Sequence, residues 1–142
     1  MKRVLVVLAC VLLALIYFLF PSNSPEECFK KGEDYANGVG VKKNNKEAVK
    51  WYRKAAERGH AEAQRRLAYG YYYGQFGIGE NKTEGIKWCR KSAENGDSTA
   101  QWWLGELYLN GESVEKDVNE ALRWYRKAAE DGVYDAQMRL GD

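Results

Sequence analysis

One phrase returns three times along this chain at a spacing of 36 to 37 residues. In each copy a tryptophan is followed by Tyr or Cys, then by Arg-Lys, and then by a small residue, Ala and Glu; the three tryptophans are Trp51, Trp88 and Trp124. A fixed period between about 20 and 50 residues is typical of solenoids, whose units bury their apolar faces only by stacking on one another. The period therefore predicts a stack of similar units.

A second phrase alternates with the first and completes the unit. Its copies begin Ala-Gln at Ala63, Ala100 and Ala136, and glycine-rich turns separate the two phrases. Apolar residues in both phrases recur every three to four positions, as on one face of an α-helix. We therefore expect each unit to be two helices packed face to face. We expect helices to start near Thr83, near Asp97 or Ser98, and near Asn119. We expect helices to end at Gly59, Gly96 and Gly132.

The large residues at the repeated positions are expected to form the core between these helices. A buried aromatic side chain removes about 150–250 Å² from water. The predicted structural core is Trp51, Trp88, Trp124, Leu67, Tyr71, Leu104 and Tyr108.

These phrases resemble the Sel-one-like repeat, a relative of the tetratricopeptide repeat. The stretches closest to that motif are residues 61–64, Leu104-Gly105, Tyr108 and residues 124–132. The resemblance implies an all-α fold, a right-handed α-α solenoid of three repeats and a terminal half repeat that binds other proteins, and it implies no catalytic residue. The expected repeats cover residues of about 26–59, 60–96 and 97–132, with a half repeat at 133–142. Departures from the motif are Lys31, Gly85, Cys89 and a one-residue insertion between Gly74 and Gly85.

The N-terminus has a different composition. An unbroken apolar run of 17 residues begins at Val4, ends at Phe20, and follows Lys2 and Arg3. Its length lies between that of a secretory signal and that of a membrane-spanning helix. We expect residues 1–20 to be an uncleaved signal anchor, or alternatively a cleaved signal, joined by a linker at 21–25 to the repeats. In both cases the positive-inside rule places the repeats outside the cytoplasm, in the periplasm of a bacterium or secreted.

Charge excludes one class of partner. Without the first 20 residues, acidic and basic side chains number 20 each, so the exported part has no net charge. The Arg-Lys pairs at 53–54, 90–91 and 126–127 are expected to form intrahelical ion pairs with Glu57, Glu94 and Glu130. We therefore predict no nucleic-acid binding, and a monomer whose contact with the membrane is through residues 4–20.

Catalytic and metal-binding patterns are not found. The sequence has one histidine, His60, and its three cysteines have no Cys-x-x-Cys spacing. His60 is expected to serve in a turn or as a helix cap. We predict no catalytic residue, metal or cofactor, and we leave open whether Cys28 pairs with Cys89 after export.

Positions that the repeat pattern leaves outside the core predict the binding surface. Aromatic residues, Arg and Met are enriched at the centres of protein interfaces, and here they recur along the first helix of each unit, which is expected to line the concave face. The predicted partner-binding residues are Phe29, Arg65, Tyr69, Tyr72, Tyr73, Trp102, Glu106 and Met138.

The sequence thus predicts an exported or membrane-anchored module that binds a protein or peptide through a concave aromatic groove. Two alternatives remain at this point. One is a hydrolase acting on the cell wall or on β-lactams, an activity associated with some exported, cysteine-rich members of the family that the sequence resembles. The other is a structural spacer.

Overall fold

All regular secondary structure in the described part of the chain is helical. The computed structural model describes residues 2–19 and 24–141, with side chains at 4–12, 15 and 24–141, and over these ranges it contains no strand. The elements are α1 (Lys2–Leu19), α2 (Pro25–Asn37), α3 (Asn45–Glu57), α4 (Ala61–Tyr73), the 3₁₀ turn η1 (Gln75–Gly77), α5 (Lys82–Glu94), α6 (Ser98–Asn110), α7 (Val118–Glu130) and α8 (Tyr134–Gly141).

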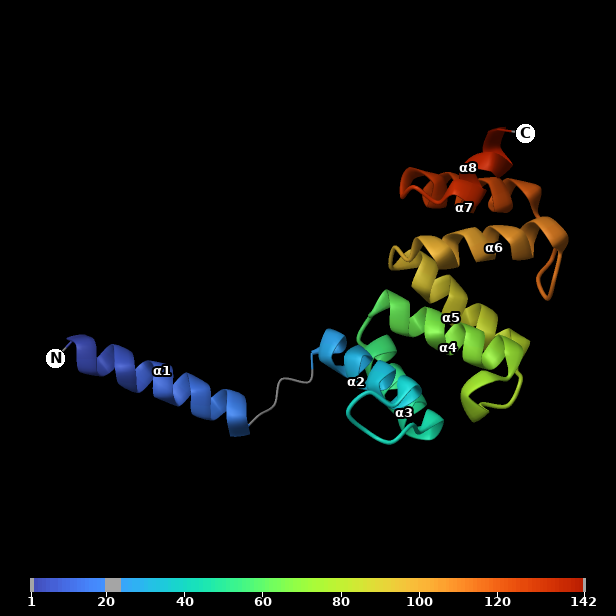
Figure 1. The fold of residues 1–142 in the computed structure, drawn as a ribbon. Coiled ribbons are helices and arrows are strands. Elements are labelled where there is room, and N and C mark those ends of the chain that lie inside the picture. Colours follow the sequence, from blue (N-terminus) through green and yellow to red (C-terminus); the bar gives the residue numbers. More distant parts are fainter. Residues whose placement is uncertain (1, 20–23, 142) are drawn as a thin grey trace.

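From α2 onward the helices stack in chain order (Figure 1). The most extensive packing is within the pairs α2/α3, α4/α5 and α6/α7, and each pair packs on the next through α3/α4, α5/α6 and α7/α8. The predicted all-α solenoid of helical hairpins with a terminal half unit is therefore confirmed.

The N-terminal helix α1 is separated from this stack by residues 20–23, which the structure does not describe (Figure 1). Within the described ranges, no helix is both long enough and apolar enough to cross a membrane. Phe20, the end of the predicted anchor, lies outside the described residues, as do most of the linker and Asp142.

Local hydrogen bonds explain where the helices begin. Asn44, Asn81 and Asp117 each accept a backbone N–H of the first turn of α3, α5 and α7. The caps of α5 and α7 therefore lie two residues before Thr83 and Asn119, the starts expected from the sequence. The helix-ending glycines Gly59, Gly96 and Gly132 have φ of 85–90°, a left-handed conformation that glycine adopts without strain.

The repeated tryptophans occupy equivalent sites, but not to the same depth. Trp88 and Trp124 are buried, whereas Trp51 is only partly buried. In each repeat a lysine three residues later lies over the indole ring, at 4.2, 4.4 and 4.6 Å from its centroid in chain order. The Arg-Lys pairs are thus not the ion-paired helix surface expected from the sequence, because their lysines cover the tryptophans. The described ion pairs include none to Glu57, Glu94 or Glu130.

A polar contact repeats at the junctions between units. The side chains of Gln64, Gln101 and Gln137 donate to the carbonyls of alanines eight residues earlier, at 2.9, 3.1 and 3.2 Å. These bonds add a second donor to carbonyl groups at helix ends that already accept the backbone N–H of the helix-ending glycines. They hold the start of each unit against the end of the preceding one.

Candidate binding surface

The first helices of successive units are joined by a contact that recurs three times. We call each of these contacts a rung and define it by three equivalent positions, two on successive first helices and one on the second helix between them. The first rung is Glu33, Tyr52 and Arg66; the second is Tyr69, Cys89 and Trp103; the third is Glu106, Tyr125 and Arg139.

The first and third rungs are charged. Arg66 donates to both carboxylate oxygens of Glu33, at 3.1 and 3.3 Å, and the Tyr52 hydroxyl donates to the same carboxylate at 2.5 Å. In the third rung Arg139 donates to Glu106 at 3.0 and 3.2 Å. These two rungs repeat the same bidentate geometry on opposite sides of the second.

The phenol of each charged rung is part of this network. The Tyr125 hydroxyl donates to Glu106 at 2.7 Å, as Tyr52 does to Glu33. Burial and the neighbouring carboxylate together raise the pKa of both phenols above the ordinary value. Both hydroxyls therefore stay protonated and act as hydrogen-bond donors at neutral pH.

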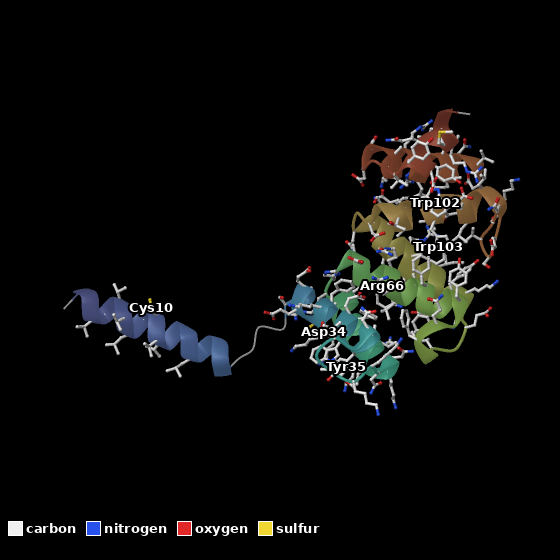
Figure 2. The ribbon with its side chains drawn as sticks, viewed as in Figure 1. Cys10, Asp34, Tyr35, Arg66, Trp102 and Trp103 are labelled. Carbon is white, nitrogen blue, oxygen red and sulfur yellow. The ribbon has the colours of Figure 1, made fainter. Side chains whose placement is uncertain are left out.

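The second rung contains no charged group. The Tyr69 ring stacks on the Trp103 indole with centroids 4.6 Å apart and planes inclined by 25°. Figure 2 labels Trp103 on α6 and Arg66 on α4, its counterpart in the first rung. An aromatic contact thus replaces the ion pair between the second and third units.

Cys89 explains how the larger indole fits. In the other rungs the second helix contributes a tyrosine, whose ring lies so close to Gly32 or Gly105 that a Cβ there would come within 2.5–2.6 Å of it. Cys89 has a smaller side chain, and the first-helix position equivalent to these glycines is Ala68. Burial raises the pKa of the Cys89 thiol, so it behaves as an apolar group. At positions 68, 69, 89 and 103 the second rung has residues different from those at the equivalent positions of the other two rungs. These four differences therefore form one coupled change in packing.

Tyr73 extends the second rung to the surface. Its ring lies 6.0 Å from those of Tyr69 and Trp103, at 26° and 19°, and the residue is 53% exposed. Three rings of similar orientation thus run from the interior to solvent. We call Tyr69, Tyr73 and Trp103 the aromatic platform.

The structure divides the predicted binding residues into different environments. Tyr72 is not on the exposed stripe: it is 2% exposed, and its hydroxyl donates to Glu112 at 2.9 Å. Its position on α4 directs the side chain toward α5, where the backbone of Gly85 lies against it. Trp102 is partly buried and packs against both core clusters.

The remaining predicted positions are held by neighbouring side chains or lie at the end of the stack. Phe29 stacks on His60, with centroids 4.6 Å apart. Arg65 donates to Asp97 at 3.0 Å and to Glu62 at 3.1 Å. Met138 is 48% exposed and lines a hollow of about 390 Å³ with Trp102, Asp135 and Arg139. Glu106 belongs to the third rung.

Two residues of this region were absent from the predicted binding set. Trp103, which is 6% exposed, forms half of the stacked pair; its replacement of the arginine found at the equivalent positions 66 and 139 was the available signal. Phe76, in the segment between Gly74 and Gly85 that holds the insertion, has φ of 57°, unusual for a phenylalanine. It lines two hollows of about 380 and 410 Å³.

The structure assigns His60 to structural contacts. Its Nδ1 accepts the Ala63 N–H at 3.2 Å, capping α4, and its Nε2 lies 2.8 Å from Glu26. Both ring nitrogens are therefore engaged. Cys28 and Cys89 are both buried, and within the described ranges no cluster of three metal-ligating side chains occurs.

These features define the class of the protein as an α-solenoid of two-helix repeats. The Sel1 repeat family model matches residues 28–60, 61–97 and 98–133, which include all three rungs except Arg139. The chain belongs to the Sel1 repeat family. None of the curated proteins compared with the chain matches it.

Solved structures agree with this assignment. A Sel1 repeat protein from Oxalobacter formigenes is 37% identical with a TM-score of 0.81, covering 86% of this chain and 91% of its own. The protein c5321, described as a protective antigen of uropathogenic Escherichia coli with an SLR fold, is 30% identical with a TM-score of 0.78; the match covers 92% of this chain and 28% of that one. Helicobacter pylori cysteine rich protein B, 23% identical with a TM-score of 0.60, shares the fold over 66% of this chain and 69% of its own.

Proposed function

We propose that this chain is an interaction module that binds a partner polypeptide on the face formed by α2, α4, α6 and α8, with the aromatic platform at its centre. The observation that carries the proposal is the exposed, stacked ring of Tyr73. A tyrosine in such a position supplies a large contact area with little loss of conformational freedom, and tyrosines are among the residues that dominate binding energies at protein interfaces.

The two kinds of rung differ in energetics and in what they present to solvent. A stacked aromatic pair contributes about 0.5–1.5 kcal/mol beyond burial, and a partly exposed ion pair contributes about 0–1 kcal/mol. Because Trp103 is also buried, the second rung stabilises the stack at least as much as the charged rungs do. Only beside the second rung does an exposed aromatic ring, that of Tyr73, continue the contact to solvent.

Site-specific cross-linking tests this proposal. A photoreactive phenylalanine analogue at Tyr73 should cross-link to a discrete partner in extracts of the native organism, and the same analogue at Val118 provides the matched control. Val118 is also exposed, at 47%, but lies on α7, outside the proposed face. Equal cross-linking at both positions, or at neither, would contradict the proposed surface.

We also propose that the repeats act outside the cytoplasm. The support is the apolar run of residues 4–20 after Lys2 and Arg3, a charge arrangement that directs the following domain across the membrane. In a bacterial host, a C-terminal reporter active only in the periplasm should be active. Activity of a cytoplasmic reporter instead would reject export, and the mass of the exported chain distinguishes an anchor in the inner membrane from a cleaved signal.

A further inference from the structure

We propose that the two hollows that share Phe76 form one binding site for a stretch of polypeptide in which an acidic residue adjoins an apolar one. The carboxylate lies beside Lys43, and the apolar side chain lies against Val49 and Ile78. This site is separate from the aromatic platform, so it goes beyond the proposed function and is tested independently of it.

The longer turn of the second unit brings Phe76 back onto the first unit. The turns between the two helices of a unit cover residues 38–44, 74–81 and 111–117, so the second is one residue longer than the others. Its 3₁₀ turn η1 contacts both α3 and α4. The Phe76 ring meets the Tyr52 ring edge-on, with centroids 6.0 Å apart. Phe76 therefore lies beside the first rung, between the first and second units.

The local structure makes room for this ring at the expense of backbone strain. The φ of 57° at Phe76 is a conformation that residues other than glycine, asparagine and aspartate rarely adopt. Gly70 on α4 leaves the necessary space, because a Cβ there would lie 2.9 Å from the Ile78 Cδ1 and 3.4 Å from the Phe76 Cδ2. Strained residues of this kind are concentrated at ligand-binding and catalytic sites. The surroundings of Phe76 are therefore the place to look for a ligand.

The two hollows beside Phe76 differ in chemistry. The first, of about 380 Å³, is polar, and its lining extends from the first rung to Asn37, Lys43, Asn45 and Gln75. The second, of about 410 Å³, is mainly apolar, and its lining includes Val49, Gly77, Ile78, Asn45 and Lys46. Because Asn45 and Phe76 line both, the hollows adjoin. Tyr52 is the only buried residue among the lining residues, so both hollows are open to solvent.

The charges around the hollows select an acidic ligand. Glu33 is the only acidic residue of the lining, and its carboxylate already accepts hydrogen bonds from three other lining side chains. Asp34 and Glu80 line neither hollow. Lys43 and Lys46 take part in none of the ion pairs of the described residues. A carboxylate placed here therefore gains a counter-charge as it loses water.

The remaining lining residues favour a polypeptide with an apolar residue next to the acid. Val49 and Ile78 are only partly buried, so a side chain such as leucine placed against them removes further apolar area from water. The side chains of Asn45 and Gln75 make no hydrogen bond within the described ranges. Such amides both donate and accept, and they can therefore pair with the N–H and C=O groups of a bound peptide backbone.

The experiment titrates the full chain, kept in solution with a mild detergent, with a capped decapeptide of glycine and serine that carries Glu-Leu at its centre. Two matched peptides carry Gln-Leu or Glu-Ser there instead. Backbone N–H signals in NMR spectra report both affinity and location. We expect the Glu-Leu peptide to shift the signals of Asn45, Lys46 and Gly77. Each matched peptide should bind at least about threefold more weakly, as for loss of a partly exposed ion pair or of a partly buried leucine.

Two variants assign each preference to its part of the site. When Lys43→Gln and Lys46→Gln are combined, the Glu-Leu and Gln-Leu peptides should bind equally, because the counter-charge is gone. Phe76→Asn should lose most of the preference for Glu-Leu over Glu-Ser, and asparagine tolerates the positive φ of the turn. Lys50→Gln is the control and should keep both preferences, because Lys50 is paired with Glu47 and lines neither hollow. Thermal unfolding verifies that each variant is folded.

Several results would overturn the inference. These are unchanged N–H signals up to about 1 mM peptide, or equal binding of the three peptides by the native chain. A preference for Glu-Leu over Gln-Leu that persists without Lys43 and Lys46 would also overturn it. Signal changes confined to Tyr69, Tyr73 and Trp103 would place the acidic segment on the aromatic platform, which rejects this site while leaving the proposed function intact.

Discussion

The Tyr69 ring stacks on the Trp103 indole, with centroids 4.6 Å apart, at the position where the adjoining junctions hold the Glu33–Arg66 and Glu106–Arg139 ion pairs. The same fold therefore accommodates two chemically different contacts between units. Cys89 makes this possible because it occupies less space than the tyrosine of the other rungs. The aromatic junction and its small neighbour should be energetically coupled.

This coupling can be measured at Cys89. Cys89→Tyr alone should destabilise the domain by about 1–3 kcal/mol, because the added ring enters a fully packed junction beside Trp103. The triple variant with Tyr69→Glu and Trp103→Arg should recover most of that loss. Denaturant unfolding of all three single variants and of the triple variant checks this, and additive effects would show that the three positions are independent.

Gly85 should be intolerant of alanine, although Ala48 and Ala121 occupy the equivalent positions. A Cβ at Gly85 would lie 2.8–2.9 Å from backbone atoms of Tyr72. Gly85→Ala should therefore lower the free energy of unfolding by about 1–3 kcal/mol through overpacking. Gly141→Ala, where a Cβ has open space, is the control and should change stability little. A stabilised Gly85→Ala variant would refute the close approach of α4 and α5.

Asp131→Asn should stabilise the third repeat. The Gln101 Oε1 is buried without a hydrogen-bond partner, whereas the equivalent oxygen of Gln64 accepts a bond from Asn95 at 2.9 Å. Asp131 is the counterpart of Asn95, and an amide there can donate where a carboxylate cannot. The expected gain is about 1 kcal/mol, typical of one hydrogen bond. Thermal unfolding measures this gain. Asn95→Asp, which removes the equivalent bond to Gln64, should lower the stability instead.

The tryptophans should differ in their contribution to stability. Trp88 is 6% exposed, and Trp88→Ala should cost about 3–5 kcal/mol in unfolding free energy because it leaves a large cavity. Trp51→Ala should cost less, since its ring is already partly in contact with water. Chemical unfolding of the two variants tests this order, and equal losses would contradict the difference in burial.

Alkaline pH should destabilise the fold through Tyr52 and Tyr125. Burial and the hydrogen bond to a carboxylate raise the folded-state pKa of both phenols, so folding favours the protonated form. Their contribution is present below the unfolded pKa of about 10 and is lost as pH rises above it, because the unfolded chain then releases these protons first. Tyr125→Phe should show a smaller loss of melting temperature between pH 9 and 11 than the native chain. Tyr134→Phe, at an exposed position, should lose as much melting temperature over this pH range as the native chain does.

The sequence by itself determined the repeat, the helical class and the family. A period of 36 to 37 residues indicates repeated units of one kind, and the helical spacing of Ala, Leu and Trp within each phrase specifies the faces on which those units stack. These features, and the helix-ending glycines, depend only on residues that are close together in the sequence. They can therefore be predicted without the tertiary structure.

The tertiary structure decided which of the remaining aromatics are buried and which reach solvent. Tyr72 and Tyr73 are adjacent in the chain, yet one is 2% and the other 53% exposed. The difference depends on how α5 and the loop at Glu112 pack against α4, and that packing involves residues up to 40 positions away. The pairing of Tyr69 with Trp103, 34 residues apart, likewise arises only when successive units stack, because the rise and rotation between units set which side chains meet.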